Sequence, residues 1–174
     1  LFYSISVISL PKALTLAFIA PLVVTAFSPI LLGEKVGYKR WLAVIIGFLG
    51  SQIVFRPGFV EINLASFAAL GTGIMYGFYL IITRKLSKSD NPLLTLLLTG
   101  VVGAIIISLT MPFVWVAPTL NQWSLLGAVG LFACVGHFFL ILSLNYADAS
   151  TLAPFRYFEI VTNIIIGYYF FSDF

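Results

Sequence analysis

The chain has 174 residues, of which 61% are hydrophobic and 9% are charged, and its mean hydropathy is +1.11. Soluble domains carry roughly a quarter charged residues, so this chain has too few charges to cover a surface that faces water. The formal net charge of +3 comes from basic residues scattered through short loops, which form no patch for nucleic acid. The single cysteine, Cys134, excludes a disulfide framework and a cysteine-based metal site.

Long apolar blocks alternate with short polar connections along the whole chain. A helix needs about 20 apolar residues to cross a bilayer, and strands of membrane β-barrels would alternate apolar and polar residues. The blocks are apolar all round, so they predict one partial and six complete helical spans: residues 1–10, 13–32, 38–55, 63–83, 92–115, 123–145 and 152–172. The expected connections are 11–12, 33–37, 56–58, 84–91, 117–122 and 146–151.

The sequence begins and ends inside apolar runs, and we therefore expect it to be part of a longer membrane protein. When connections are assigned alternately to the two sides, six basic residues fall on one side, in 33–40 and 84–91. Only Lys12 and Arg56 fall on the other side. The positive-inside rule then predicts that loops 33–40 and 84–91 are cytoplasmic.

The chain contains a weak internal repeat. When the sequence is compared with itself after a shift of 139 residues, the lengths of the expected helices and loops agree. Residues 2–5 then align with 141–144, and Gly33–Glu34 aligns with Ser172–Asp173. The shift covers an odd number of spans, so the two copies enter the membrane from opposite sides. Inverted repeats of this kind are typical of secondary transporters, whose substrate sites lie near the bilayer midplane.

An ordered set of short motifs resembles the EamA-type transporters of the drug/metabolite transporter superfamily. Pro21 is followed by Gly33–Glu34. The segment 41–50, which begins with Trp41 and contains two glycines, is followed by an Arg-Pro-Gly triplet. The motif segments are 20–22, 31–36, 41–50, 56–58, 153–159 and 171–173. The chain departs from the family pattern at Ile160, where a proline often follows the glutamate.

The resemblance implies a fold of ten helices in two inverted repeats, with both termini in the cytoplasm. On that plan residues 1–58 are the end of the first repeat, and 59–174 are most of the second. The fold class is then an all-α integral membrane bundle of about seven transmembrane helices, one of them partial. The resemblance also implies a secondary transporter of small organic metabolites, an exporter or permease of the bacterial inner membrane.

Charged groups inside membrane spans are costly, and they mark functional sites unless they only pair with each other. Apart from Lys39 and Arg40 in the first residues of the span at 38–55, such charges within the predicted spans occur in the last segment, at Arg156 and Glu159. The two residues lie three positions apart on one face of a helix and are expected to pair. Glu159 is a candidate to accept a coupling proton or to meet a cationic group of the substrate. The alternative for both is a structural ion pair, with Arg156 reaching toward the interface.

Other polar and aromatic residues are candidates of the same kind. His137 and Asn163 are candidates for substrate binding, and Tyr76, Tyr79 and Tyr157 for an aromatic pocket; the alternative is packing between helices. Pro21, Pro29 and Pro154 are expected to break helices near a site. Glycine pairs at 47/50, 73/77, 100/103 and 127/130 predict close helix packing.

The sequence therefore favours a secondary transporter, with coupling to a proton as one option. No metalloprotease, nucleophile-elbow or phosphate-loop motif is present, so we expect neither an enzyme nor a bound cofactor or metal. The expected partners are a small-molecule solute and the lipid bilayer, with a homodimer left open. The rival interpretations are a non-transporting membrane subunit with an assembly or regulatory role, and an intramembrane enzyme.

Overall fold

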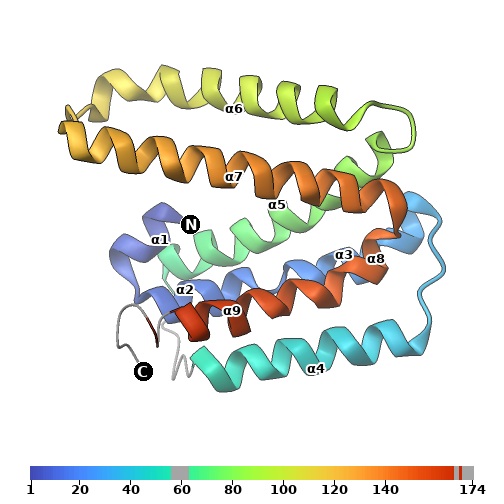
Figure 1. Cartoon of the computed structure of the whole chain (residues 1–174). Coiled ribbons are helices and arrows are strands. Elements are labelled where there is room, and N and C mark those ends of the chain that lie inside the picture. The colour runs from blue at the N-terminus through green and yellow to red at the C-terminus, as the bar shows by residue number, and fades with distance from the viewer. Residues whose placement is uncertain (56–62, 167–168, 170–174) are drawn as a thin grey trace. The chain divides into compact units, whose positions relative to one another are not determined.

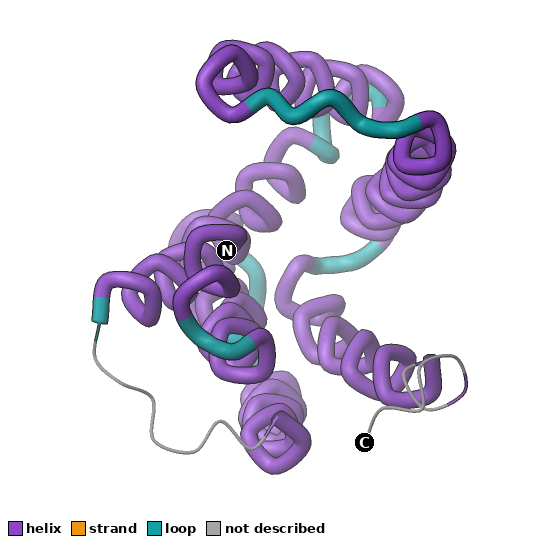
Figure 2. Tube along the Cα trace, turned by 90° about the vertical axis from the view of Figure 1, so that its left-hand side faces the viewer, coloured by secondary structure: helices purple, strands orange, loops and turns teal. Residues whose placement is uncertain are grey.

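A computed structural model describes residues 1–55, 63–166 and 169, and every regular element in these ranges is helical. The elements are α1 (Phe2–Val7), α2 (Leu10–Ala17), α3 (Ala20–Leu32), α4 (Tyr38–Phe55), α5 (Leu64–Leu86), α6 (Pro92–Val114), α7 (Leu120–Tyr146), α8 (Ala149–Leu152), the 3₁₀ helix η1 (Ala153–Tyr157) and α9 (Phe158–Ile166). Figure 1 shows their order, and Figure 2 shows only helix and loop in the described part. The predicted all-α fold is confirmed.

The chain divides into two compact units, Leu1–Ile82 with Asp148–Phe174, and Thr83–Ala147. The first unit therefore contains α1 to α4, most of α5, and α8, η1 and α9. Its buried core is rich in small side chains, among them Ala13, Ala20, Ala65, Ala69 and Ala149. Small residues let helix backbones approach closely, which is how helices associate in a membrane.

The predicted second span is broken into two helices. α2 ends at Ala17, and α3 begins at Ala20 after a turn at Phe18 and Ile19. Pro21 lies in the first turn of α3, where a missing N–H is tolerated. It has no N–H to give to the carbonyl of Ala17, so the helix cannot continue regularly across this point. The expectation that Pro21 interrupts a helix is confirmed, whereas Pro29 lies inside α3.

The predicted turn at Pro11–Lys12 is wrong. The turn lies earlier, at Ile8 and Ser9, and Pro11 belongs to the first turn of α2. Proline is well suited to that position because the first N–H groups of a helix have no partner within it.

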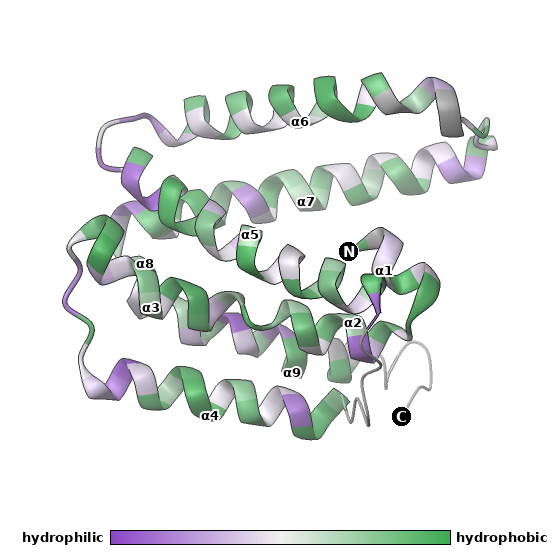
Figure 3. Ribbon diagram, turned by 180° about the vertical axis from the view of Figure 1, so that it is seen from behind, coloured by the Kyte–Doolittle hydropathy of each residue, from purple (hydrophilic) through white to green (hydrophobic). Residues whose placement is uncertain are grey.

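The last predicted span is also divided. Residues 149–166 form α8, η1 and α9 in direct succession, and Pro154 lies in the first turn of η1. This composite segment contacts α3 through α8 and η1. The two run side by side in opposite directions, as Figures 1 and 3 both show. Two interrupted helices thus lie against each other in the first unit.

The second unit is built from the end of α5 with α6 and α7, which contact each other. Asn91 caps α6 by accepting the Leu93 N–H at 2.9 Å, and Thr119 forms a capping box with Gln122 at the start of α7. Both helices are apolar along most of their length in Figure 3, and most of their apolar side chains are exposed. Such surfaces suit contact with lipid.

Three predicted connections are longer than those observed. α5 continues to Leu86, the loop before α7 ends at Thr119, and only Ala147 and Asp148 separate α7 from α8. The capping box explains the second case, because Thr119 and Gln122 satisfy each other's backbone N–H groups. The predicted connection at 56–58 and the family-like residues 171–173 lie outside the described residues.

Four stretches of the described chain are long and apolar enough to cross a membrane: Leu10–Leu32, Leu64–Leu86, Pro92–Leu109 and Leu120–Tyr146. The predicted span at 38–55 does form a helix, α4, of 18 residues. It is not among the four stretches, because Lys39, Arg40 and Gln52 lower its hydropathy. The described part of the segment from 152 is not among the four stretches either.

Candidate functional site

Arg156 and Glu159 form the ion pair expected from their spacing. Arg156 Nε lies 2.9 Å from Glu159 Oε2, and the side chains are 38% and 46% exposed. Arg156 lies in η1 and Glu159 in the first turn of α9. The pair therefore lies at the junction of two short helices, where it is open to a ligand.

Tyr76 of α5 is the third member of this group. Its hydroxyl accepts a hydrogen bond from Arg156 Nη1 at 2.7 Å, and Arg156 Cζ lies 4.5 Å from the centroid of its ring. A guanidinium over an aromatic face is attracted by the ring quadrupole. Arg156 is thus held by a carboxylate and by a phenol from another helix, which restricts its orientation.

These three side chains line a cavity of about 190 Å³ in the first unit. Apolar residues of the interrupted α2–α3 segment also line it, including Ala17, Phe18 and Pro21. Gly73 of α5 lies so close to that segment that a Cβ atom would come within 2.5 Å of the Ala17 carbonyl oxygen. The cavity thus presents a cation, an anion and a phenol beside an apolar surface, a combination that suits a small solute with mixed polar and apolar groups.

Tyr157 points away from this cavity. Its side chain is buried, its hydroxyl donates to the Phe18 carbonyl at 3.3 Å, and the two rings stack with centroids 5.8 Å apart. On its other side the ring lies against Gly47 of α4, where no Cβ atom would fit. The structure thus places Tyr157 as a packing element between α4 and the α2–α3 break.

The described lining of the cavity does not include the other predicted residues. The Tyr79 ring is tilted against that of Tyr76, with ring centroids 5.9 Å apart, but it does not line the cavity. His137 lies in α7, in the second unit. Asn163 belongs to α9, but its side chain lies outside the described residues.

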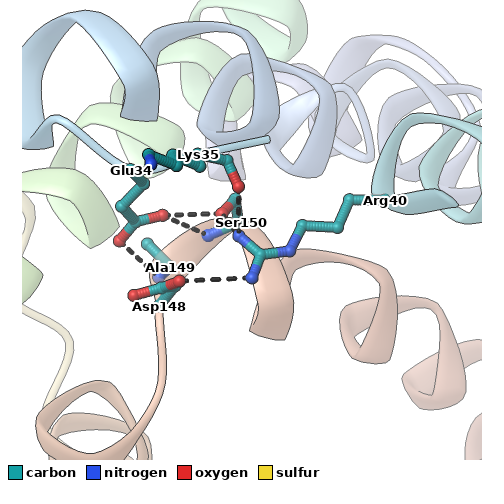
Figure 4. Close-up of polar contacts among 6 residues, drawn as sticks. All are labelled: Glu34, Lys35, Arg40, Asp148, Ala149 and Ser150. Carbon is teal, nitrogen blue, oxygen red and sulfur yellow. Dashed lines mark hydrogen bonds and ion pairs between the residues drawn. The ribbon is translucent and has the colours of Figure 1, made fainter. Parts of the chain in front are cut away.

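A second polar group, the Glu34 cluster, consists of Glu34, Arg40, Asp148 and Ser150 (Figure 4). Gly33 ends α3 with a φ of 69°, a left-handed conformation that glycine adopts without strain, and thereby redirects the chain. Glu34 is 7% exposed and accepts the N–H groups of Ala149 and Ser150 at 2.9 and 3.0 Å, and the Ser150 hydroxyl at 2.6 Å. The carboxylate thus caps the start of α8.

Arg40 completes the Glu34 cluster from the first turn of α4. Its Nη2 donates to Asp148 Oδ2 at 3.2 Å, and its Nη1 donates to the Ser150 hydroxyl at 2.7 Å. Nη1 also donates to the carbonyl of Lys35 at 3.1 Å. The 33–37 loop is therefore fastened to the connection between α7 and α8, more than 100 residues away in sequence.

The Glu34 cluster is not predicted by the sequence. In the sequence, Glu34 belongs to a family-like motif, and Arg40 counts only as one of the basic residues that indicate orientation. A local signal was present, because Asp148-Ala149-Ser150 has the composition of a helix start, and such starts attract carboxylates. The partner of that start could not be read from sequence spacing.

The predicted glycine packing is only partly found in the structure. Gly73 and Gly77 lie against the α2–α3 segment, and a Cβ atom on Gly77 would come within 2.8 Å of Val23. By contrast, a Cβ atom at Gly100, Gly103, Gly127 or Gly130 would meet no atom within 4 Å. The close packing expected at those four glycines is therefore absent from the described residues.

Long apolar helices, together with interrupted helices that carry a charged cavity, define an all-α integral membrane protein. Comparison with known proteins gives its family. Residues 63–173 match the EamA-like transporter family, so the chain belongs to this family, whose members are transporters and not enzymes.

Several curated proteins are similar over almost the whole chain. An S-adenosylmethionine uptake transporter of Rickettsia bellii is 26% identical over 172 residues, covering 99% of this chain and 59% of the relative. A riboflavin transporter of Vibrio cholerae is 29% identical, covering 90% of this chain and 53% of the relative. A pseudopaline exporter of Pseudomonas aeruginosa is 28% identical, covering 99% and 61%. The chain thus spans only about three-fifths of these relatives, and no solved structure matches it.

Proposed function

We propose that this chain is the central part of a secondary transporter that moves a small organic metabolite across a bilayer. The observation that carries this proposal is the cavity at Arg156, Glu159 and Tyr76, which places a charged pair beside interrupted helices. Interrupted helices near the membrane midplane are where transporters of this type bind their solutes.

The names of the relatives support a small organic solute and leave the direction of transport open. They include proteins named for uptake of S-adenosylmethionine, for riboflavin and for export of pseudopaline. We place the protein in a bacterial inner membrane, with loops 33–40 and 84–91 facing the cytoplasm. The excess of basic residues in those loops supports this orientation.

The two-repeat plan, with residues 1–58 in one copy and 59–174 in the other, is part of the proposal. Two features support it. A shift of 139 residues carries the turn at Phe18 and Ile19 onto Tyr157 and Phe158, where η1 gives way to α9. The two interrupted segments also run in opposite directions (Figure 1), as inverted copies must.

The first experiment tests transport itself. The full-length protein is purified, reconstituted in vesicles and supplied with a panel of radiolabelled vitamins, nucleoside derivatives and amino acids. We expect saturable flux for at least one solute with no other protein present. No saturable flux for any solute class would favour the rival function, a non-transporting membrane subunit.

The second experiment tests whether Glu159 couples transport to protons. In Glu159→Gln the side chain no longer gains or loses a proton, so we expect accumulation driven by a pH gradient to be lost while exchange of solute continues. Asp90→Asn is the matched control, since Asp90 lies in the loop before α6 and does not line the cavity. If Glu159→Gln kept the pH dependence of transport seen in the wild type, Glu159 would have no role in proton coupling.

A further inference from the structure

A second hollow in the first unit lies between α4 and the α8–η1–α9 segment. It is an open groove of about 300 Å³, lined by Lys39, Arg40, Ala43, Thr151, Pro154, Phe155 and Phe158. The residues from the second segment have the spacing of one helical face. The other face of that segment, with Ala153, Tyr157 and Ile160, is buried in the core. The groove is therefore the outward side of a packed helix pair.

The groove is polar at one end and apolar along the rest. α4 and the α8–η1–α9 segment run side by side in the same direction (Figure 1), each starting from one of the loops joined by the Glu34 cluster. Lys39, Arg40 and Thr151 lie near these starts. Ala43, Phe155 and Phe158 lie farther along, about 6–10 Å deeper at roughly 1.5 Å per residue. Phe155 and Phe158 are 61% and 65% exposed, and their rings stack with centroids 6.1 Å apart.

At the polar end of the groove, Lys39 is the basic residue that can bind a ligand, because Arg40 already has partners. The guanidinium of Arg40 is paired with Asp148 and bonded to Ser150. Lys39 is exposed, and its amino group has no hydrogen-bond or ion-pair partner within the described residues. Trp41 is the next aromatic residue of α4, at the position where indole rings favour the membrane interface. In the proposed orientation, an ammonium group without a partner in the described residues thus lies beside an apolar groove, on the cytoplasmic headgroup side.

We propose that this groove binds an anionic phospholipid of the cytoplasmic leaflet. Lys39 contacts the phosphate of the headgroup, and one acyl chain lies along Ala43, Phe155 and Phe158. Basic side chains at the cytoplasmic end of membrane helices select anionic headgroups in this way, and the apolar walls bind the acyl chain without distinguishing one headgroup from another. Selectivity for charge therefore resides mainly in Lys39.

The test uses the purified full-length protein and native mass spectrometry of its complexes with phosphatidylglycerol and phosphatidylcholine. One lysine near a membrane surface favours an anionic lipid by about 1 kcal/mol, which is about fivefold in affinity. We expect such a preference for phosphatidylglycerol in the wild type, retention in Lys39→Arg and loss in Lys39→Gln. Lys88→Gln, an exposed lysine on the same predicted side, is the matched control and should retain it.

Location is tested with a phosphatidylglycerol that carries a photoreactive diazirine in its acyl chain. We expect crosslinks to peptides of α4 and of residues 149–166, and a severalfold reduction in Phe155→Ala with Phe158→Ala. Three results would overturn the proposal. They are equal binding of both lipids, an unchanged preference in Lys39→Gln, or crosslinks absent from these peptides because another part of the full-length protein fills the groove.

Discussion

The contact between Gly47 and Tyr157 shows how a single missing side chain shapes the core of the first unit. The tyrosine ring occupies the space where a Cβ atom of residue 47 would lie. This close approach brings α4 against η1 and lets the Tyr157 hydroxyl reach the carbonyl of Phe18. By comparison, the Arg156–Glu159 ion pair is partly exposed, and such pairs contribute at most about 1 kcal/mol to stability. The glycine is structural, whereas the charged pair is available for function.

Gly47→Ala tests this role. The added methyl group overlaps the Tyr157 ring, and overpacking of this kind costs about 1–3 kcal/mol. We expect a clear fall in the thermal melting temperature of the detergent-solubilised protein, measured by fluorescence-detected gel filtration. Gly50→Ala is the control in the same helix, because a Cβ atom there meets nothing within 4 Å. Equal melting temperatures for the two variants would contradict the packing role.

At the scale of the helical element, α8 depends on groups outside itself. It has only four residues, too few to form a stable helix without external contacts. The Glu34 carboxylate supplies acceptors for its first N–H groups, and Arg40 fixes Asp148 and Ser150 in place. The start of the second interrupted segment is therefore set by a loop from the far end of α3.

Glu34→Gln measures that dependence. The glutamine side chain carries no negative charge. Its NH₂ group, a donor, replaces one of the carboxylate oxygens that accept the N–H groups of α8. Buried hydrogen bonds to a charged group contribute about 1.5–3 kcal/mol each, so we expect a loss of at least 2 kcal/mol in stability. Lys35→Gln is the control, since only the backbone carbonyl of Lys35 takes part in the Glu34 cluster. A melting temperature no lower than that of the control would contradict this account.

The sequence predicted most helices because apolar length and proline position are local signals. It predicted the interruption near Pro21 and the pairing of Arg156 with Glu159, which depend on neighbouring residues. It expected a helix break at Pro154, but it did not predict that residues 153–157 form a 3₁₀ helix, because a 3₁₀ turn retains the same apolar composition as an α-helix. It also did not identify Tyr76 as the partner of Arg156, since the two are 80 positions apart and only the packing of α5 joins them.

At the scale of the whole molecule, the distribution of charge supports the proposed orientation in the bilayer. Lys35, Lys39 and Arg40 lie around the start of α4, and Arg84 donates hydrogen bonds to the carbonyls of Leu144 and Asn145 at the end of α7. Arg84 thus contacts a helix end in addition to supporting the proposed topology. Their positions next to short loops are those that count most in the positive-inside rule.

Cysteine labelling checks this orientation in intact cells. Cys134 is first replaced by serine, and single cysteines are then introduced as Ser89→Cys, in the loop before α6, and Pro118→Cys, in the loop before α7. A membrane-impermeant maleimide added outside should label Pro118→Cys and should label Ser89→Cys only after the cells are opened. The reverse pattern would show that loops 33–40 and 84–91 face outward.

The stacked rings of Phe18 and Tyr157 lie 139 positions apart, the same interval that relates the two proposed repeats. In the two-repeat plan they occupy equivalent positions of the two repeats. A position that contacts its own equivalent lies close to the two-fold axis that relates the repeats. In a half-length ancestor that assembled as a two-fold symmetric dimer, the same aromatic side chain would have met itself at this point, as isologous contacts require. In such an ancestor any mutation there would have altered both partners at once. Fusion of the two copies would have removed that constraint, leaving one side free to carry the hydroxyl that bonds the backbone of the other.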